Sequence, residues 1–79
     1  MNIKVLGTGC SKCKSLEKVT REAVAEMGIN AEVEKVEDIV KIMQYGVMRT
    51  PALVINEKVA ISGSLPSITE IKELISKNL

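Results

Sequence analysis

The sequence predicts an α/β protein with a mixed four-stranded sheet and helices on both faces. Two observations lead to this fold class. Short apolar or alternating runs, typical of strands, are interspersed with stretches in which apolar residues recur every three or four positions, typical of helices. In chain order the segments read strand, helix, strand, helix, strand, strand, helix. The length of 79 residues predicts a single domain over residues 1–79, because a chain of this size has room for one core.

The first three elements follow from apolar periodicity. Residues 3–6 form a short apolar run that predicts a buried strand, and the turn at 7–9 stops it. Residues 11–27 carry an apolar stripe opposed by charged side chains and predict an amphipathic helix that ends at Gly28. Residues 31–36 alternate at a period of two with glutamates along one face, which is typical of a charged edge strand. A right-handed crossover through the helix makes the two strands parallel.

A short helix and a pair of strands come next. Asp38 is a suitable N-cap for a helix that runs through Tyr45 and ends at Gly46. Apolar residues at 52–55 and 59–61 predict two antiparallel strands of a hairpin.

The hairpin turn and the final helix complete the chain. In the turn, Asn56 readily adopts a positive φ angle, whereas Glu57 adopts one reluctantly. Ser67 and Glu70 are spaced as a capping box, and the apolar stripe over 68–75 predicts a helix behind it.

Composition excludes several classes of function. The 11 basic and 10 acidic side chains give a net charge of +1, so no broad basic surface attracts nucleic acid or an anionic membrane. One tyrosine without phenylalanine or tryptophan leaves no platform on which single-stranded bases could stack. Histidine is absent, which excludes His-based catalysis and His-coordinated zinc. No apolar run reaches the roughly 18 residues that cross a bilayer, and we expect a cytoplasmic protein.

The two cysteines are the most informative residues. Cys10 and Cys13 close too short a loop to work as a structural staple, because so small a ring removes little entropy from the unfolded chain. Cys10 stands at the start of the first helix, where the positive end of the helix dipole favours a thiolate. Lys12 and Lys14 add positive charge within one turn and are predicted to lower the pKa of Cys10 further.

Cys13 lies one turn further into the helix, beside its apolar stripe, and within disulfide reach of Cys10. The two thiols are therefore expected to differ: Cys10 attacks a disulfide and Cys13 resolves the mixed disulfide. The spacing alone also permits two alternatives, binding of a soft metal and an inert buried pair.

A second informative step is Thr50-Pro51, ahead of the first hairpin strand. Proline at a strand's first position has no ladder hydrogen bond to lose, so the residues alone favour an ordinary strand start. Arg49, just before this step, is placed to steer an acidic substrate or donor toward Cys10, but its simpler interpretation is a solvated loop charge.

Taken together, three features resemble the thioredoxin superfamily: the sequence Cys10-Ser11-Lys12-Cys13 behind the first strand, Thr50-Pro51 at the start of the third, and the element order. More closely, the chain is similar to the small thioredoxin-like, redox-active disulfide proteins of archaea and bacteria, whose core has the size of a glutaredoxin.

This resemblance implies a thiol-disulfide oxidoreductase that reduces protein disulfides. It implies a cis bond before Pro51, a peptide site shaped by Thr50 and Pro51, and a match of the family's glycine after the hairpin to Gly63. It further implies a monomer that needs no cofactor besides the disulfide between Cys10 and Cys13, and a thioredoxin-reductase-like or other dithiol electron donor.

Three departures from the family pattern concern the site. Ser11-Lys12 replaces the dipeptide Gly-Pro of thioredoxins, so the redox potential does not carry over. Lys4 stands where thioredoxins have a buried aspartate six residues before the first cysteine, and we expect this lysine to extend to solvent. A single glycine, Gly63, follows the hairpin in place of the glutaredoxin pair that holds glutathione.

Two other functions compete with this hypothesis. The segment from Gly7 to Cys13 also resembles the metal loop of heavy-metal-associated domains, in which two thiolates bind copper(I), so a copper(I) chaperone is the main alternative. Those domains end in a strand and lack the Thr-Pro step. The other possibility is a binding module whose cysteines form a regulatory switch without turnover, with a hydrophobic surface around Val47, Met48 and Pro51, although Val47 and Met48 could equally pack in the core.

Overall fold

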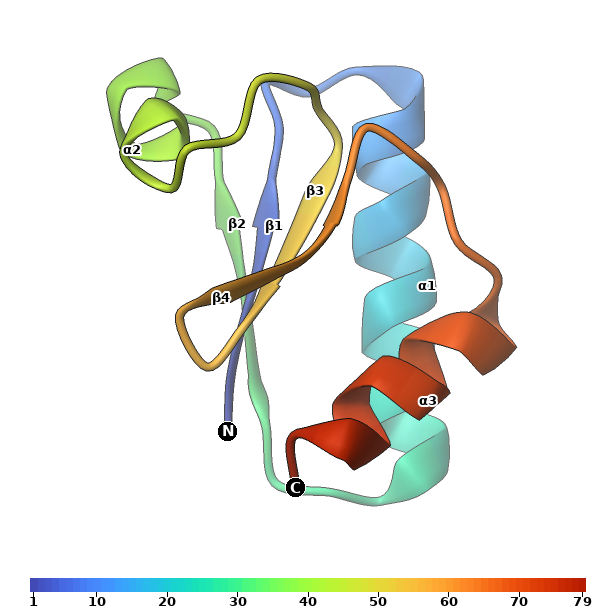
Figure 1. Ribbon diagram of the computed structural model, residues 1–79. Coiled ribbons are helices and arrows are strands. Elements are labelled where there is room, and N and C mark those ends of the chain that lie inside the picture. Colours follow the sequence, from blue (N-terminus) through green and yellow to red (C-terminus); the bar gives the residue numbers. More distant parts are fainter.

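The computed structural model describes residues 1–79 and contains seven elements in the predicted order (Figure 1). They are β1 (Asn2–Leu6), α1 (Ser11–Met27), β2 (Glu32–Val36), α2 (Ile39–Gln44), β3 (Ala52–Ile55), β4 (Lys58–Ser62) and α3 (Ile68–Lys77).

The four strands form one mixed sheet in the order β2-β1-β3-β4. β1 and β2 run parallel, as the crossover through α1 requires, whereas β1 with β3 and β3 with β4 are antiparallel. All four residues of β3 are buried, and the charged β2 occupies one edge. The predicted fold class is confirmed.

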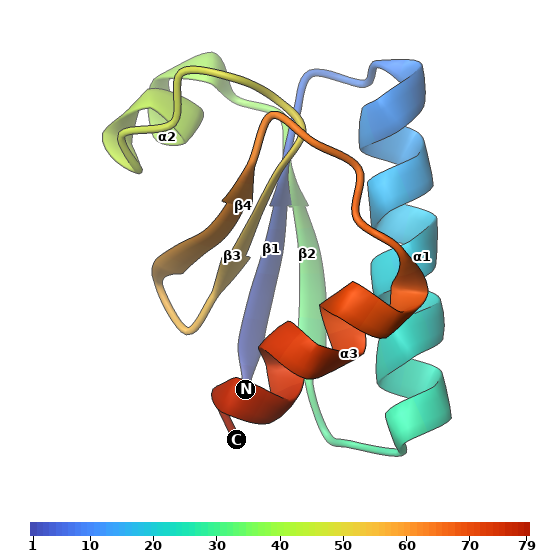
Figure 2. The ribbon, with the colours of Figure 1, turned by 45° about the vertical axis from the view of Figure 1, so that its right-hand side comes forward.

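The helices lie on both faces of the sheet, with α1 and α3 on one face and α2 on the other (Figures 1 and 2). Each face has its own hydrophobic cluster. The larger cluster joins α1 and α3 to the sheet and consists of Ile3, Val5, Leu16, Ala23, Leu53, Ile55, Ile71 and Ile75. The smaller one lies on the α2 side and consists of Leu6, Val36, Ile42, Val47, Ala52 and Val54.

The helix ends follow the predicted signals. The Ser67 hydroxyl accepts the Glu70 N–H at 3.2 Å and the Glu70 carboxylate accepts the Ser67 N–H at 3.3 Å, which forms the capping box. Asp38 caps α2 by accepting the N–H of Val40 at 2.9 Å. Gly28 ends α1 in the left-handed region, with a φ of 63°.

Strand direction brings the functional loops together. Because β4 has the same direction as β1 and β2, the carboxyl ends of these three strands and the start of β3 share one end of the sheet. Figure 1 shows this end at the top, with both chain termini at the opposite end. The loops at 7–10 and 45–51 and the segment after β4 therefore meet near the start of α1.

None of the helices combines the length and the apolar character that a membrane-spanning segment needs.

Thr20 is the one fully buried residue whose side-chain oxygen has no hydrogen-bond partner. A buried unsatisfied hydroxyl costs about 1 kcal/mol or more, so we expect Thr20→Val to raise the free energy of unfolding by about 1 kcal/mol. Urea denaturation measures this change. Thr20→Ser is the matched control, because it keeps the hydroxyl and removes only a methyl group, and we expect it to destabilise the fold. A Thr20→Val protein less stable than the wild type would show that the hydroxyl has a partner.

Candidate active site

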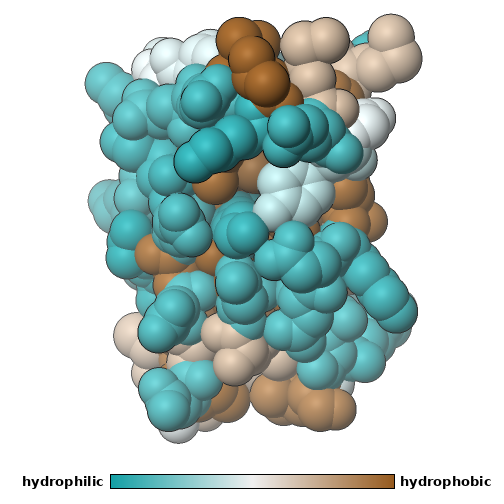
Figure 3. Space-filling model, turned by 90° about the vertical axis from the view of Figure 1, so that its left-hand side faces the viewer, coloured by the Kyte–Doolittle hydropathy of each residue, from teal (hydrophilic) through white to brown (hydrophobic).

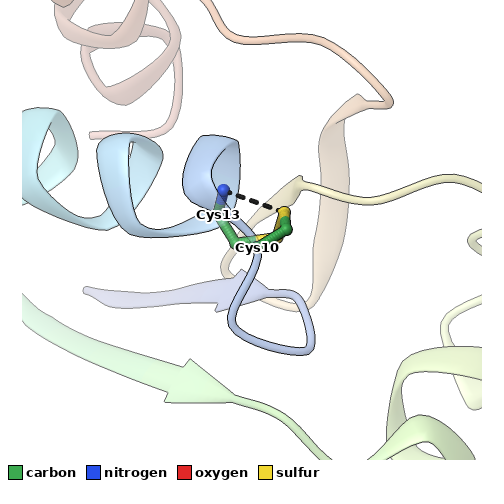
Figure 4. Close-up of a disulfide and its surroundings, with 2 residues drawn as sticks. All are labelled: Cys10 and Cys13. Carbon is green, nitrogen blue, oxygen red and sulfur yellow. Dashed lines mark hydrogen bonds between the residues drawn. A yellow bond between two sulfur atoms is a disulfide. The ribbon is translucent and has the colours of Figure 1, made fainter.

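The two cysteines form a disulfide at the start of α1 (Figure 4). Cys10 is the N-cap residue, with extended backbone angles, and Cys13 lies in the first turn, with 5.0 Å between their Cα atoms. Cys10 is exposed, whereas Cys13 is buried with 4% of its surface accessible. The structure thus places one sulfur at the surface and the other in the interior.

The outer sulfur faces the backbone of the helix. The Cys13 N–H donates a hydrogen bond to Cys10 Sγ at 3.1 Å, drawn as a dashed line in Figure 4. This N–H is one of the donors that a helix leaves unpaired at its first turn, and it lies at the positive end of the helix dipole. The same position stabilises negative charge when the Cys10 sulfur is a thiolate.

Gly7 makes the packing of the inner sulfur possible. This glycine directly follows β1 in the chain and is buried, and its N–H donates to the carbonyl oxygen of Val36 at 3.0 Å. A Cβ atom at residue 7 would lie 2.8 Å from the Cβ of Cys13, closer than side chains pack. The sequence alone does not predict this role, because a glycine in a turn gives no sign of which side chain approaches it.

The segment before β3 lies on the other side of the disulfide. Figure 4 shows it beside Cys10, in agreement with the pairing of Leu6 with Ala52, which places the end of β1 next to the start of β3. The Thr50–Pro51 peptide bond is cis, Pro51 is buried and Thr50 is exposed.

Gly63 joins this group through β4. Its N–H donates to the carbonyl oxygen of Pro51 at 2.8 Å, and its φ of 77° is a conformation that favours glycine. The structure therefore brings Gly63, Thr50 and Pro51 to the same end of the sheet as the two cysteines.

The two lysines of the first turn of α1, Lys12 and Lys14, are exposed. Neither forms an ion pair, and the first turn contains no acidic residue. Their charges are therefore not neutralised by a neighbouring carboxylate. Of the two apolar residues before Arg49, Val47 is buried in the smaller cluster, whereas Met48 is 96% exposed.

Lys4 does not extend freely into solvent, and that expectation was wrong. Its Nζ donates to the hydroxyl of Tyr45 at 2.8 Å and to Oε1 of Glu57 at 3.0 Å, and the Tyr45 hydroxyl donates to Oε2 of Glu57 at 3.1 Å. The Lys4 side chain is 19% exposed, and its Nζ lies 5.5 Å from the centre of the Tyr45 ring. The three side chains thus connect β1, the end of α2 and the hairpin turn.

The charged forms of Lys4 and Glu57 stabilise each other, and Tyr45 stabilises both. The hydrogen bond to Tyr45, followed by that to Glu57, raises the pKa of Lys4. The hydrogen bond from Lys4, followed by that from Tyr45, lowers the pKa of Glu57. Glu57 also adopts a φ of 68°, which glutamate disfavours, and these contacts help to offset the cost of that conformation.

A pH dependence follows from the Glu57 shift. Because its pKa is lower in the folded state, the carboxylate contributes stability above its unfolded pKa of about 4.3, and the contribution is lost as the pH falls through the folded value. We expect Glu57→Gln to lower the urea midpoint at pH 7 and to approach the wild-type midpoint near pH 3. Glu73→Gln, at an exposed residue of α3 without an ion pair, is the control and should change neither midpoint. A deficit of Glu57→Gln that persists undiminished at low pH would contradict this role of the charge.

A surface hollow of about 510 Å³ lies on the α2 side of the sheet, away from the disulfide. Most of its lining residues are polar or charged: Lys4, Glu34, Lys35, Val36, Glu37, Asp38, Lys41, Gln44, Tyr45 and Glu57. Figure 3 shows the middle of this face as largely hydrophilic, with hydrophobic side chains at its top and bottom ends. Cys10 is exposed, and neither cysteine lines this hollow.

The features of a copper(I) chaperone are only partly present. The exposed Cys10 and the buried Cys13 are joined as a disulfide. The chain ends in the helix α3, whereas heavy-metal-associated domains end in a strand.

Comparisons with known proteins agree with this arrangement. A family model described as a thioredoxin domain matches residues 1–76. A thioredoxin of Methanothermobacter thermautotrophicus is 42% identical over 76 residues, which cover 96% of this chain and 99% of that protein. A thioredoxin of Methanocaldococcus jannaschii is 38% identical over 77 residues, covering 98% and 88% of the two chains. A probable thioredoxin of Archaeoglobus fulgidus is 37% identical over 71 residues, covering 86% and 77%.

Proposed function

Since the chain belongs to the thioredoxin family and is a thiol-disulfide oxidoreductase, we propose that it reduces disulfides of proteins through its Cys10-Ser11-Lys12-Cys13 site. The observation that carries the proposal is the unequal placement of the two sulfurs. Cys10 is exposed at the helix cap and accepts the N–H of Cys13, whereas Cys13 is buried against Gly7.

The reaction starts from the reduced protein. The Cys10 thiolate attacks one sulfur of the substrate disulfide, that S–S bond breaks, and the second substrate sulfur leaves as a thiolate. The Cys13 thiolate then attacks Cys10 Sγ and releases the first substrate sulfur. Two electrons pass to the substrate, which takes up two protons, and the bond between Cys10 and Cys13 forms. A dithiol donor such as a thioredoxin-reductase-like protein reduces this bond again.

The hydrogen bond from the helix supports the choice of Cys10 as the attacking group. A thiolate there is stabilised by the N–H of Cys13 and by the helix dipole, and the unpaired charges of Lys12 and Lys14 act in the same direction. The buried Cys13 is out of reach of a large substrate, but it is already at bonding distance from Cys10. These roles use no cofactor other than the cysteine pair.

The substrate chain is proposed to lie across Thr50, Pro51 and Gly63. Thr50 is exposed and is the residue just before buried Pro51, so its backbone is free to pair with an extended peptide in β fashion at the end of the sheet that carries Cys10. The hydrogen bond from Gly63 to Pro51 fixes this edge. The proposal describes a monomer acting on protein substrates in the cytoplasm.

Reduction of insulin tests the proposal. With dithiothreitol or a thioredoxin reductase as donor, we expect the protein to accelerate precipitation of the insulin B chain well above the rate with the donor alone. Absence of insulin reduction with both donors would contradict the proposed function and favour a binding module whose cysteines form a regulatory switch. Anaerobic titration of the reduced protein with copper(I) tests the other alternative, because tight stoichiometric binding together with absence of turnover would favour a metal chaperone.

A further inference from the structure

Arg49 carries an unpaired positive charge in the segment beside the disulfide, and this charge carries an inference about the substrate. We propose that Arg49 binds a carboxylate of the substrate beside the disulfide under attack. The inference rests on the proposed reduction of disulfides at Cys10 and specifies the substrates that this site prefers.

Arg49 is held in place by contacts on the β4 side of the site. Its aliphatic stem lies over Gly63, where an added Cβ atom would come within 2.9 Å of Arg49 Cβ and 3.1 Å of its Cδ. Its carbonyl oxygen accepts the hydroxyl of Ser62 at 3.3 Å. The N–H of Gly63 donates to Pro51, so the arginine is tied to the segment beside Cys10. A stem packed in this way has less conformational freedom to lose when its guanidinium binds a ligand.

The guanidinium itself has no partner. None of its nitrogen atoms donates a hydrogen bond or forms an ion pair, although Arg21 is paired with Glu17 at 3.0 Å and Lys35 with Glu37 at 3.5 Å. Arginine presents several N–H groups in a planar fork that matches a carboxylate. The structure therefore leaves an exposed carboxylate-binding group free at the edge of the site.

The acidic charge lies on the opposite side. A Cβ atom on Gly9 would lie 3.5 Å from Oε2 of Glu37, so this carboxylate borders the loop before Cys10 from the β2 side. β2 and β4 are the two edge strands of the sheet. Glu37 directly follows β2, whereas Arg49 packs on Gly63, which directly follows β4. Because Glu37 is paired with Lys35 at 3.5 Å, the charge that orients a substrate carboxylate is that of Arg49 on the β4 side.

Three matched peptides test the proposal. Each contains one cysteine blocked as a 2-pyridyl disulfide and flanked by glutamate, glutamine or lysine, and release of pyridine-2-thione reports the attack of Cys10 on the cysteine sulfur. At low salt we expect the reduced wild-type protein to react about five-fold faster with the glutamate peptide than with the glutamine peptide, and slowest with the lysine peptide. In about 1 M sodium chloride the preference should disappear, because the screening length falls to about 3 Å.

Variants assign the preference to Arg49. Arg49→Gln should reduce the preference to the part that Lys12 and Lys14 still provide, and Arg49→Lys should retain more of it, because lysine keeps the charge but lacks the planar fork. Lys77→Gln, at the far end of α3, changes the net charge equally and should leave the preference intact.

The outcomes separate the two proposals. A glutamate preference that Arg49→Gln leaves undiminished, or that Lys77→Gln weakens equally, would overturn the role of Arg49 while disulfide reduction stands. Failure of every peptide to react, the uncharged one included, would overturn the proposed function itself.

Discussion

Cys13→Ser accumulates mixed disulfides with substrate proteins, whereas Cys10→Ser forms none: this is the expected result of replacing the two cysteines one at a time. Without Cys13 the first attack still occurs, but no thiolate remains near Cys10 to release the captured protein. Without Cys10 the remaining thiol is buried at 4% exposure, and a large substrate cannot reach it. Both variants should reduce insulin no faster than the donor alone.

Each variant is exposed to a cell lysate, and the trapped complexes are measured by non-reducing electrophoresis. Excess dithiol should reduce the mixed disulfides and release the captured proteins. The variant with both cysteines replaced is the control for non-specific capture. Equal trapping by Cys10→Ser and Cys13→Ser would contradict the assigned roles, because it would mean that both sulfurs are open to partners.

Gly7→Ala should impair both stability and turnover. The added methyl group would lie 2.8 Å from the Cβ of Cys13, so the first turn of α1 has to move away from the end of β1. Overpacking of this kind costs about 1–3 kcal/mol, and we expect a loss of that size in the free energy of unfolding. The shift also displaces Cys13 relative to Cys10, so insulin reduction by the folded protein should fall, because the resolving step depends on their alignment.

Gly28→Ala separates the two effects. Gly28 ends α1 at its far end, and an added methyl group meets no atom within 4 Å, but its φ of 63° is costly for alanine. This variant should therefore lose stability without losing turnover, when turnover is compared at temperatures where each protein is fully folded. If Gly7→Ala reduces insulin as fast as the wild type under the same conditions, Gly7 does not position Cys13.

Local sequence signals were sufficient to predict the architecture. Each of these signals involves residues only a few positions apart. They are the periods of the apolar residues, the capping pair Ser67 and Glu70, and the spacing of Cys10 and Cys13. Such patterns act over one helical turn or one strand, and the observed order of the elements confirms them. The location of Thr50-Pro51 beside the cysteines rested on the family resemblance, since its residues alone indicated only a strand start.

Contacts between distant residues could not be predicted in this way. The trio of Lys4, Tyr45 and Glu57 unites side chains 41 and 12 positions apart, and it depends on the strand register and on where α2 crosses the sheet. The approach of Gly7 to Cys13 likewise depends on how the end of β1 meets the first turn of α1. No local period encodes either contact.

The position of the chain termini has a practical consequence. Both lie at the end of the molecule opposite the disulfide (Figure 1). A tether attached to either terminus, whether to an electrode, a resin bead or a fused reporter, leaves the Cys10 sulfur pointing into the bulk solution. The protein can therefore be attached through either terminus with the disulfide at the end away from the attachment point.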